Sequence, residues 1–460
     1  MPAPSPTLKD RRTLLGIVLA LGLLSLLVHL YPFLSIDNPL GYDSGFYRRY
    51  LTQPYISFPN AEVPGLSDTL IPRLFLDSLR LLKIPTDILL YGSYWSLFII
   101  LPILLFFWLK NYLGKRGATI AGVLLILSPV QYVGYWYMLW KNAFTLCLLL
   151  FSFICFERKW FAPLVALDIG IAFSHKTTAA IFLLTLAVLF LIHPKRRKEI
   201  FIHGLIAALS FAAINATAFE GIIRTTPVAV FLGWSEYLLL SVPIIALALF
   251  SIPAIMAKRI PSTLAAFSAV SILYPILQLP FHERIFIFSD IALVALAAYG
   301  LDFLISNLSW GSQGKKVYAY FILICIAAGL LLGNLWNEMR TRSPLMSDAD
   351  VAKINEIGKQ VPQDAIILTT SSEAPWYEGW TLSHIAAPGM LYDTHNLEEW
   401  QEIWFATSTE KTIRLLSDFP KPLYISTLGD FKYLIGNRPA CVVDVSPNLL
   451  LNECDEQSTE

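Results

Sequence analysis

Apolar segments of membrane-spanning length recur along most of this chain and constrain its fold more than any other feature. A helix needs about 20 apolar residues to cross the hydrocarbon core of a bilayer, and roughly eleven runs approach that length. Only 15% of the 460 residues are charged and 55% are hydrophobic, which excludes an ordinary soluble protein. We therefore predict a polytopic α-helical membrane protein whose spans cover residues 12–36, 86–109, 117–133, 138–156, 160–173, 177–192, 200–219, 237–256, 263–279, 285–305 and 317–336.

Basic residues in alternate loops predict the orientation of these spans. Short cytoplasmic loops carry an excess of Lys and Arg. The basic residues that share one side are Lys9, Arg11, Arg12, Lys110, Lys115, Arg116, Arg158, Lys159, Lys195, Arg196, Arg197, Lys198, Lys258, Arg259, Lys315 and Lys316. We expect an integral protein of a plasma or inner membrane with a cytoplasmic N-terminus and a retained first span. Residues 37–85 and everything after 336 then lie outside.

The composition changes after residue 336, which predicts two domains. Residues 1–336 form the transmembrane domain, and residues 337–460 form a small extracytoplasmic α/β domain. In the latter we predict strands at 365–369, 381–385, 423–426 and 441–445, and helices at 348–360, 397–405 and 411–417. Two pairs, Trp376-Tyr377 and Gly379-Trp380, form either a sugar-binding platform or part of the core. Cys441 and Cys454 could pair in an oxidising compartment.

The first outer loop, 37–85, has helical patterns of its own. From Leu70 to Leu82 the apolar residues fall at helical spacing, opposite charged residues such as Arg73 and Asp77. A second short helix is expected at 44–53. Either both helices lie in the headgroup plane and frame a site, or they are spacers that pack on the bundle.

Two carboxylates follow the first span, at Asp37 and Asp43. Asp43 lies in a turn between Gly41 and Gly45. A carboxylate at the bilayer surface can act as general base toward an acceptor hydroxyl, or it can hold a divalent cation such as Mg²⁺ or Mn²⁺. Asp37 has a second explanation as a cap of the helix end. We treat both as candidate catalytic residues and metal ligands.

The outer side also carries one basic residue in each of its short connections. These are Lys141, Lys176, Arg224 and Arg284. Either each long side chain reaches the interface separately, or together they surround an anionic headgroup, because a phosphate at a membrane surface needs cationic partners.

Two of these connections contain further polar residues. His175 and Lys176 precede Thr177 and Thr178, which could simply cap the next helix, whereas His175 and Lys176 could meet a phosphate. In the other connection, His282 and Glu283 precede Arg284. Arg284 either contacts a phosphate beside a pocket lined by His282 or Glu283, or pairs with Glu283 or Asp290 to steady its helix.

No Walker or Rossmann glycine motif occurs, and the cytoplasmic loops are too short for a nucleotide-sugar domain. A transferred sugar would then come from a lipid-phosphate donor at the outer face. The net charge of +0 gives no reason to expect a nucleic-acid partner.

These features together resemble the GT-C class of integral-membrane glycosyltransferases. The segment Gly41-Tyr42-Asp43-Ser44-Gly45-Phe46-Tyr47-Arg48 is similar to the sequence after the first helix in oligosaccharyltransferases. The connection from Ser174 to Ala179 is similar to a His-x-x-Thr-Ala turn of bacterial members. Arg284 precedes a helix rich in Ile, Phe, Leu and Ala, which also looks typical of this class.

The resemblance implies an inverting glycosyltransferase with a polyprenyl-phosphate-linked sugar donor and an outward-facing site. Asp43 would be base or metal ligand with Asp37 as its partner. Arg284 and Lys176 would bind the donor phosphate, together with His175, Lys141 and Arg224, and Tyr47, His282 and Glu283 would contact the substrate. The acceptor would be a glycan, a glycolipid or a protein. The chain lacks the Trp-Trp-Asp signature of oligosaccharyltransferases and the adjacent Asp-Glu pair of O-mannosyltransferases.

A transporter or flippase of a lipid-linked or anionic solute is the alternative. Asp168 lies well inside a predicted span, where a carboxylate is costly unless it is protonated, paired or hydrated. Asp168 either relays protons in a transporter or forms a hydrogen bond between two helices. Broken helices in paired halves, typical of transporters, are not evident in the sequence.

Overall fold

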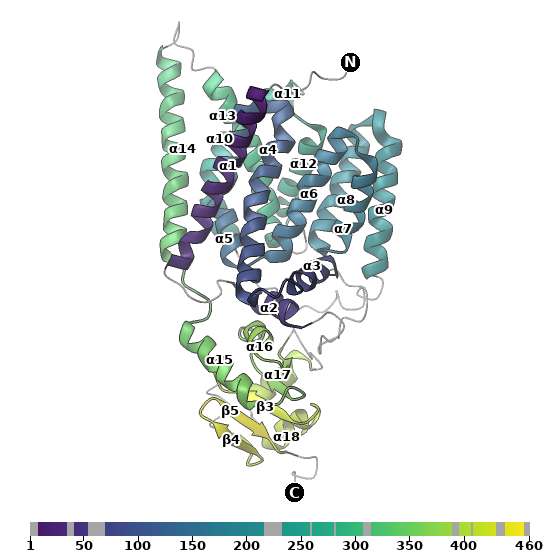
Figure 1. Cartoon of the computed structure of the whole chain (residues 1–460), viewed down its shortest axis with the longest axis vertical. Coiled ribbons are helices and arrows are strands. Elements are labelled where there is room, and N and C mark those ends of the chain that lie inside the picture. The colour runs from purple at the N-terminus through teal and green to yellow at the C-terminus, as the bar shows by residue number, and fades with distance from the viewer. Residues whose placement is uncertain are drawn as a thin grey trace. The chain divides into compact units, whose positions relative to one another are not determined.

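The computed structural model describes residues 8–34, 41–53, 70–215, 232–257, 260–279, 282–306, 314–388, 395–405, 408–428 and 438–454 (Figure 1). The chain divides into two compact units. The first comprises the described parts of Met1–Ser35, Leu66–Pro72 and Tyr91–Ser343, and the second those of Ile36–Gly65, Arg73–Leu90 and Pro344–Glu460. The second unit thus includes the described residues 41–53 of the first outer loop. A domain boundary at 336 stays a prediction.

The first unit is a bundle of apolar helices (Figure 1). Helix α3 (Leu70–Arg80) and helix α4 (Thr86–Leu127) each begin in one unit and end in the other. The other elements are α1 (Leu8–Leu30), η1 (Tyr31–Leu34), α5 (Pro129–Trp136), α6 (Trp140–Arg158), α7 (Phe161–Ala172), α8 (Lys176–Ile192), η3 (Pro194–Arg196), α9 (Arg197–Asn215), α10 (Trp234–Leu249), α11 (Ile252–Met256), α12 (Ser262–Ile276), η4 (His282–Ile285), α13 (Phe286–Ser306) and α14 (Gly314–Thr341).

The helical membrane fold predicted from the sequence is confirmed, whereas the number of spans is not. Five helices among the described residues are long and apolar enough to cross a membrane, or six if the bent pair Lys176–Ile192 and Pro194–Ile214 is one span. Helices α7, α10 and α12 are apolar but shorter. Each predicted run nevertheless contains a helix in the described part of the chain.

Helix α4 is two helices joined by a reversal at Gly114. The φ angle of Gly114 is 69°, a conformation that glycine adopts without steric cost. A Cβ atom on Gly122 would lie 3.4 Å from the carbonyl oxygen of Pro102, although in one straight helix these residues would be about 30 Å apart. The two halves therefore fold back on each other, which accounts for two of the predicted spans.

One end of the first unit, here called the basic end, joins helix ends through charged side chains. The contacts are Lys115 with Asp10 (2.6 Å), Arg116 with Asp302 (2.8 Å), Thr263 with Glu157 (2.7 Å) and Arg196 with the Phe156 carbonyl (2.8 Å). They connect the start of α1, the α4 reversal, the ends of α6 and α13, and the start of α12. These are the segments that the basic-residue pattern placed on one side.

The opposite end, here called the aromatic end, joins several of the other helix ends. Its contacts are the rings of Tyr31 and Trp336 (5.9 Å), Trp95 with Tyr135 (3.0 Å), Trp140 with Ser93 (3.1 Å), Arg342 with Glu236 (2.7 Å) and the rings of Trp234 and His282 (6.5 Å). The helices thus alternate in direction between the two ends. The side of the membrane that each end faces stays a prediction.

The second unit contains a five-stranded sheet in the order β2-β1-β3-β5-β4. Strands β2 (His384–Ala386), β1 (Ile366–Leu368) and β3 (Leu423–Ser426) are parallel, and β5 (Leu449–Asn452) runs antiparallel to both β3 and β4 (Val442–Ser446). The helices are α2 (Ser44–Thr52), α15 (Asp348–Gln360), α16 (Ala374–Trp380), α17 (Leu397–Phe405) and α18 (Thr409–Ser417).

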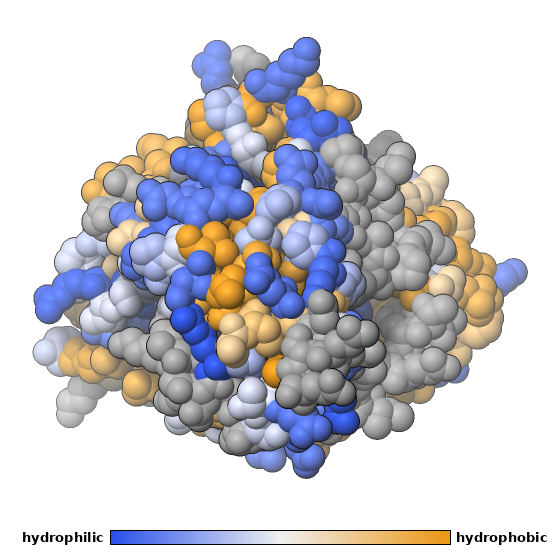
Figure 2. All heavy atoms as spheres, turned by 90° about the horizontal axis from the view of Figure 1, so that it is seen from below, coloured by the Kyte–Doolittle hydropathy of each residue, from blue (hydrophilic) through white to orange (hydrophobic). Residues whose placement is uncertain are grey.

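The predicted α/β character of the C-terminal part is confirmed with small differences. The bounds of α15, α17 and β3 match the prediction. Helix α16 and strand β5 were not predicted from the sequence. Cys441 and Cys454 form a disulfide beside the β4–β5 hairpin. Hydrophilic residues cover most of the described surface that faces the viewer in Figure 2, around a smaller apolar patch.

Candidate functional site

Asp43 lies in the second unit, directly before helix α2. Backbone and side chain of Ser44 both donate to the Gly41 carbonyl, at 3.3 and 2.6 Å, and the Tyr47 amide donates to the Asp43 carbonyl at 3.4 Å. A short hydrogen-bonded turn therefore places the Asp43 carboxylate at the start of the helix. Asp37, its predicted partner, lies outside the described residues.

Helix α2 packs against α16 through two glycines. A Cβ atom on Gly45 would lie 1.4 Å from the Pro375 carbonyl oxygen, and one on Gly379 would lie 2.4 Å from the Gly45 Cα. Only residues without a side chain allow the two backbones to approach so closely. On the other side of Asp43, the Tyr42 hydroxyl donates to the Ser371 carbonyl. Burial and the charge of Asp43 raise the pKa of Tyr42 to about 12, so the hydroxyl keeps its proton.

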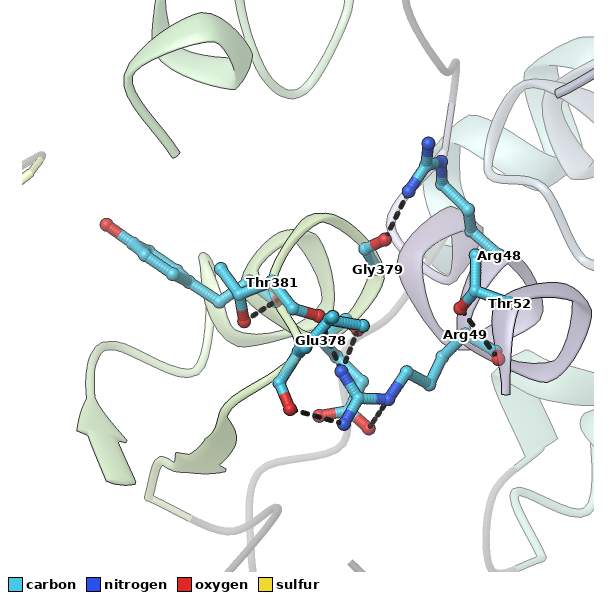
Figure 3. Close-up of polar contacts among 8 residues, drawn as sticks. Arg48, Arg49, Thr52, Glu378, Gly379 and Thr381 are labelled. Carbon is cyan, nitrogen blue, oxygen red and sulfur yellow. Dashed lines mark hydrogen bonds and ion pairs between the residues drawn. The ribbon is translucent and has the colours of Figure 1, made fainter. Parts of the chain in front are cut away.

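Arg49 of α2 is fully buried against α16 (Figure 3). Its guanidinium donates to the carbonyls of Thr381 (2.5 Å), Leu382 (3.2 Å) and Glu378 (3.4 Å), and its Nε lies 3.9 Å from Glu378 Oε1. The Glu378 side chain is also fully buried. Burial lowers the pKa of Arg49, and the charge of Glu378 opposes that shift.

Arg48 makes a second, more exposed set of contacts, and Figure 3 shows the one with Gly379. It donates to the Gly379 carbonyl at 2.6 Å and to Asp87 at 2.9 Å, and it lies 4.7 Å from the centre of the Trp380 ring. The contacts of Arg48 with Gly379 and Trp380 could not be predicted from the sequence, because they join positions more than 300 residues apart. Tyr47, a predicted substrate contact, is 3% exposed in α2; its role in binding stays a prediction.

The aromatic end of the first unit carries several predicted phosphate ligands. Lys141 lies in the first turn of α6, and the indole NH of the preceding Trp140 donates to the Ser93 hydroxyl oxygen. His175 is the N-cap of α8, and its Nδ1 lies 2.8 Å from Thr178 Oγ1. Lys176 is exposed at the start of α8. The preceding turn is tied to α3, since the Ile71 amide donates to the Phe173 carbonyl at 3.0 Å.

His282, Glu283 and Arg284 form η4 at the start of α13, also at the aromatic end. Helix α12 packs against both η4 and α8, so it links the two groups of candidates. Asp290, one predicted partner of Arg284, is buried and accepts hydrogen bonds from Ser128 (2.8 Å) and Gln131 (2.9 Å). Arg224 lies outside the described residues.

Asp168 has a buried partner that was not predicted from the sequence. Its Oδ2 lies 2.6 Å from His203 Nδ1, and both side chains are fully buried between α7 and α9. This contact fits the hydrogen-bond role between helices, one of the two roles expected for Asp168.

A metal site does not follow from the described residues. Within the part of the chain that the structure describes, no three His, Cys, Asp or Glu side chains lie close enough together to hold a metal ion. We therefore derive no chemical step through a metal.

No protein-family model and no curated protein matches the sequence. Solved structures do match. An oligosaccharyltransferase of Archaeoglobus fulgidus, tethered to an acceptor peptide, is 10% identical, with a TM-score of 0.62 over 89% of this chain and 68% of that one. Another structure of that enzyme, with zinc and sulfate, gives a TM-score of 0.60.

ArnT from Cupriavidus metallidurans matches over nearly its whole length. The apo structure is 12% identical, with a TM-score of 0.59 over 97% of this chain and 99% of that one. The structure bound to undecaprenyl phosphate gives 0.55 over 95% and 98%. The resemblance to GT-C enzymes is thereby confirmed at the level of structure, and the chain has the fold of these membrane proteins.

Proposed function

We propose that this protein is a membrane glycosyltransferase that moves a sugar from a polyprenyl-phosphate donor to an acceptor at the extracytoplasmic face. The observation that carries the proposal is the match over nearly its full length to ArnT, which has been solved with undecaprenyl phosphate. A shared fold alone does not fix an activity. The proposal therefore also rests on Asp43 at the start of α2 and on the cationic residues at the aromatic end.

In the proposed reaction, the Asp43 carboxylate accepts the proton of the acceptor hydroxyl. The acceptor oxygen attacks the anomeric carbon of the donor, and the bond from that carbon to the phosphate oxygen breaks with inversion. General-base catalysis lowers the barrier because it raises the nucleophilicity of the attacking oxygen. The leaving lipid phosphate keeps the bonding electrons, and Arg284, Lys176, His175, Lys141 and Arg224 are proposed to stabilise its charge. His282, Glu283 and Tyr47 are proposed to contact the substrate.

Arg284→Gln is expected to raise the KM for a polyprenyl-phosphate sugar about tenfold to a hundredfold and to change kcat less. A charged hydrogen bond contributes about 1.5–3 kcal/mol, and about 1.4 kcal/mol corresponds to a factor of ten. The measurement is steady-state transfer with purified protein. Lys195→Gln, at an exposed position in η3, is the matched control and should keep the original KM. An unchanged KM in Arg284→Gln would remove Arg284 from the donor site.

The disulfide tests the proposed location of the C-terminal part. Cys441 and Cys454 are 13 residues apart, and disulfides persist mainly in oxidising compartments. In denatured protein taken from cells without reduction, we expect these thiols to resist alkylation until a reductant is added. In the double variant Cys441→Ser/Cys454→Ser, reduction should produce no such increase in alkylation. Full alkylation of Cys441 and Cys454 before reduction would argue for a cytoplasmic location.

A further inference from the structure

We propose that α16 of the C-terminal α/β part is a positioning element of the active site that fixes the place of Asp43, and this inference rests on the proposed function. This helix and two residues beside it, Ser371 and Thr381, contact the chain on both sides of Asp43. Before it, the Tyr42 hydroxyl bonds the Ser371 carbonyl. After it, Gly45 packs on Pro375 and Gly379, and Arg49 is buried against Glu378 and Thr381 (Figure 3).

The position of α16 follows from the sheet. Strand β1 ends at Leu368, and the chain passes through Thr369–Glu373 into α16. The carboxyl edge of a parallel sheet is where α/β proteins usually place ligands. Here α16 lies after the carboxyl end of β1, and α2 packs against it. In this protein α2 therefore lies next to the sheet edge at which other α/β folds bind small molecules.

The fit between α2 and α16 leaves little freedom. Their backbones meet at Gly45 and Gly379, where not even a methyl group can be added without a shift of the helices. The buried Arg49 and Glu378 fix rotation about this contact, because four polar contacts of one guanidinium must be kept at once. The backbone of Asp43 is therefore set by the C-terminal part.

The functional consequence is geometric. A general base must lie within hydrogen-bond reach of the proton that it accepts. A misplacement of about 1 Å can reduce the rate about a hundredfold. A helix shift at Gly45 and Gly379 would move Asp43 by such a distance without removing any group that touches the substrate.

Gly379→Ala tests the proposal. We expect kcat to fall about a hundredfold, with an unchanged KM for the polyprenyl-phosphate sugar and with faster amide hydrogen exchange in residues 44–52. Leu416→Ala is the control, because Leu416 is buried in a separate apolar cluster of the same unit. It should lower the unfolding temperature and leave both kcat per folded molecule and exchange in α2 unchanged.

A double variant separates positioning from general destabilisation. If α16 acts through Asp43, Gly379→Ala should cause no further loss in an Asp43→Asn background. A loss by the same factor in both backgrounds would overturn the inference, as would a folded Gly379→Ala protein with the original kcat. If Gly379→Ala does not fold, Tyr42→Phe replaces it. That change removes only the hydroxyl bonded to Ser371, and we expect kcat to fall several-fold.

The same experiment keeps the two proposals apart. Full activity of Asp43→Asn would refute Asp43 as the base of the proposed function. Hydrogen exchange decides separately whether α16 orders α2: equal exchange of residues 44–52 in Gly379→Ala and the unmodified protein would refute the positioning role.

Discussion

Asp43→Asn is expected to reduce kcat for sugar transfer by about 10²- to 10⁴-fold, the range that general-base catalysis usually supplies. The amide has nearly the shape of the carboxylate but cannot accept the acceptor proton. Backbone groups and the Ser44 hydroxyl form hydrogen bonds in the turn from Gly41 to Ser44, and the substitution leaves these groups in place, so the fold should persist. Transfer from a polyprenyl-phosphate sugar to acceptor, measured at saturating donor, gives the rate.

Asp350→Asn provides the comparison for this variant. Asp350 is a carboxylate of the same unit, and among the described residues it forms hydrogen bonds with Ser347 and Lys353, near the start of α15. Its replacement should leave kcat unchanged. If Asp43→Asn retains most of the original rate while it binds donor normally, the carboxylate of Asp43 takes no part in proton transfer. Lipid flux in proteoliposomes without a transfer product would instead favour the transporter.

Arg49→Met is expected to destabilise the second unit by about 3–5 kcal/mol, the usual cost of removing one partner of a buried ion pair. The carboxylate of Glu378 would stay buried without its cation, and the carbonyls of Thr381 and Leu382 would lose a donor. The free energy of unfolding can be measured by denaturant-dependent alkylation of a cysteine introduced in the α15–β1 core.

Two further variants make this result specific. Arg49→Met/Glu378→Met should recover part of the loss, since a buried apolar pair can replace a buried ion pair at small cost. Arg48→Met is the neighbouring control: its ion pair with Asp87 is partly exposed, and such pairs contribute about 0–1 kcal/mol. If Arg48→Met and Arg49→Met lowered the free energy of unfolding equally, the buried Arg49–Glu378 pair would contribute no more to stability than the partly exposed Arg48–Asp87 pair.

The elements that were predicted from the sequence are those that form because of residues close to one another along the chain. Helix α15 begins after Ser347, whose hydroxyl accepts from the Asp350 amide at 3.1 Å, and this cap is visible in the sequence. The long apolar runs identified the helices of the first unit in the same way. The spacing of charges between loops predicted the alternation that the basic and aromatic ends now show.

Elements and contacts that depend on residues far apart in the sequence were not predicted. Helix α16 is a seven-residue segment with Pro375 and Gly379, a composition that alone favours a loop. Its Trp376 and Tyr377, one half of the possible sugar platform, are 1% and 0% exposed and belong to the core. Arg49 and Glu378 are separated by 329 positions, and Asp168 and His203 by 35. No periodicity or spacing rule connects such pairs.

The grouping of α2 with the C-terminal elements has a consequence for engineering. Chimeras between related enzymes are usually cut where a polar domain begins, which here would be near residue 344. Such a cut would pair α2 of one parent with α16 of the other, and a single methyl group at the contact of their glycines would prevent docking. A functional exchange should therefore transplant residues 41–53 together with the C-terminal part, as one cassette encoded in two pieces.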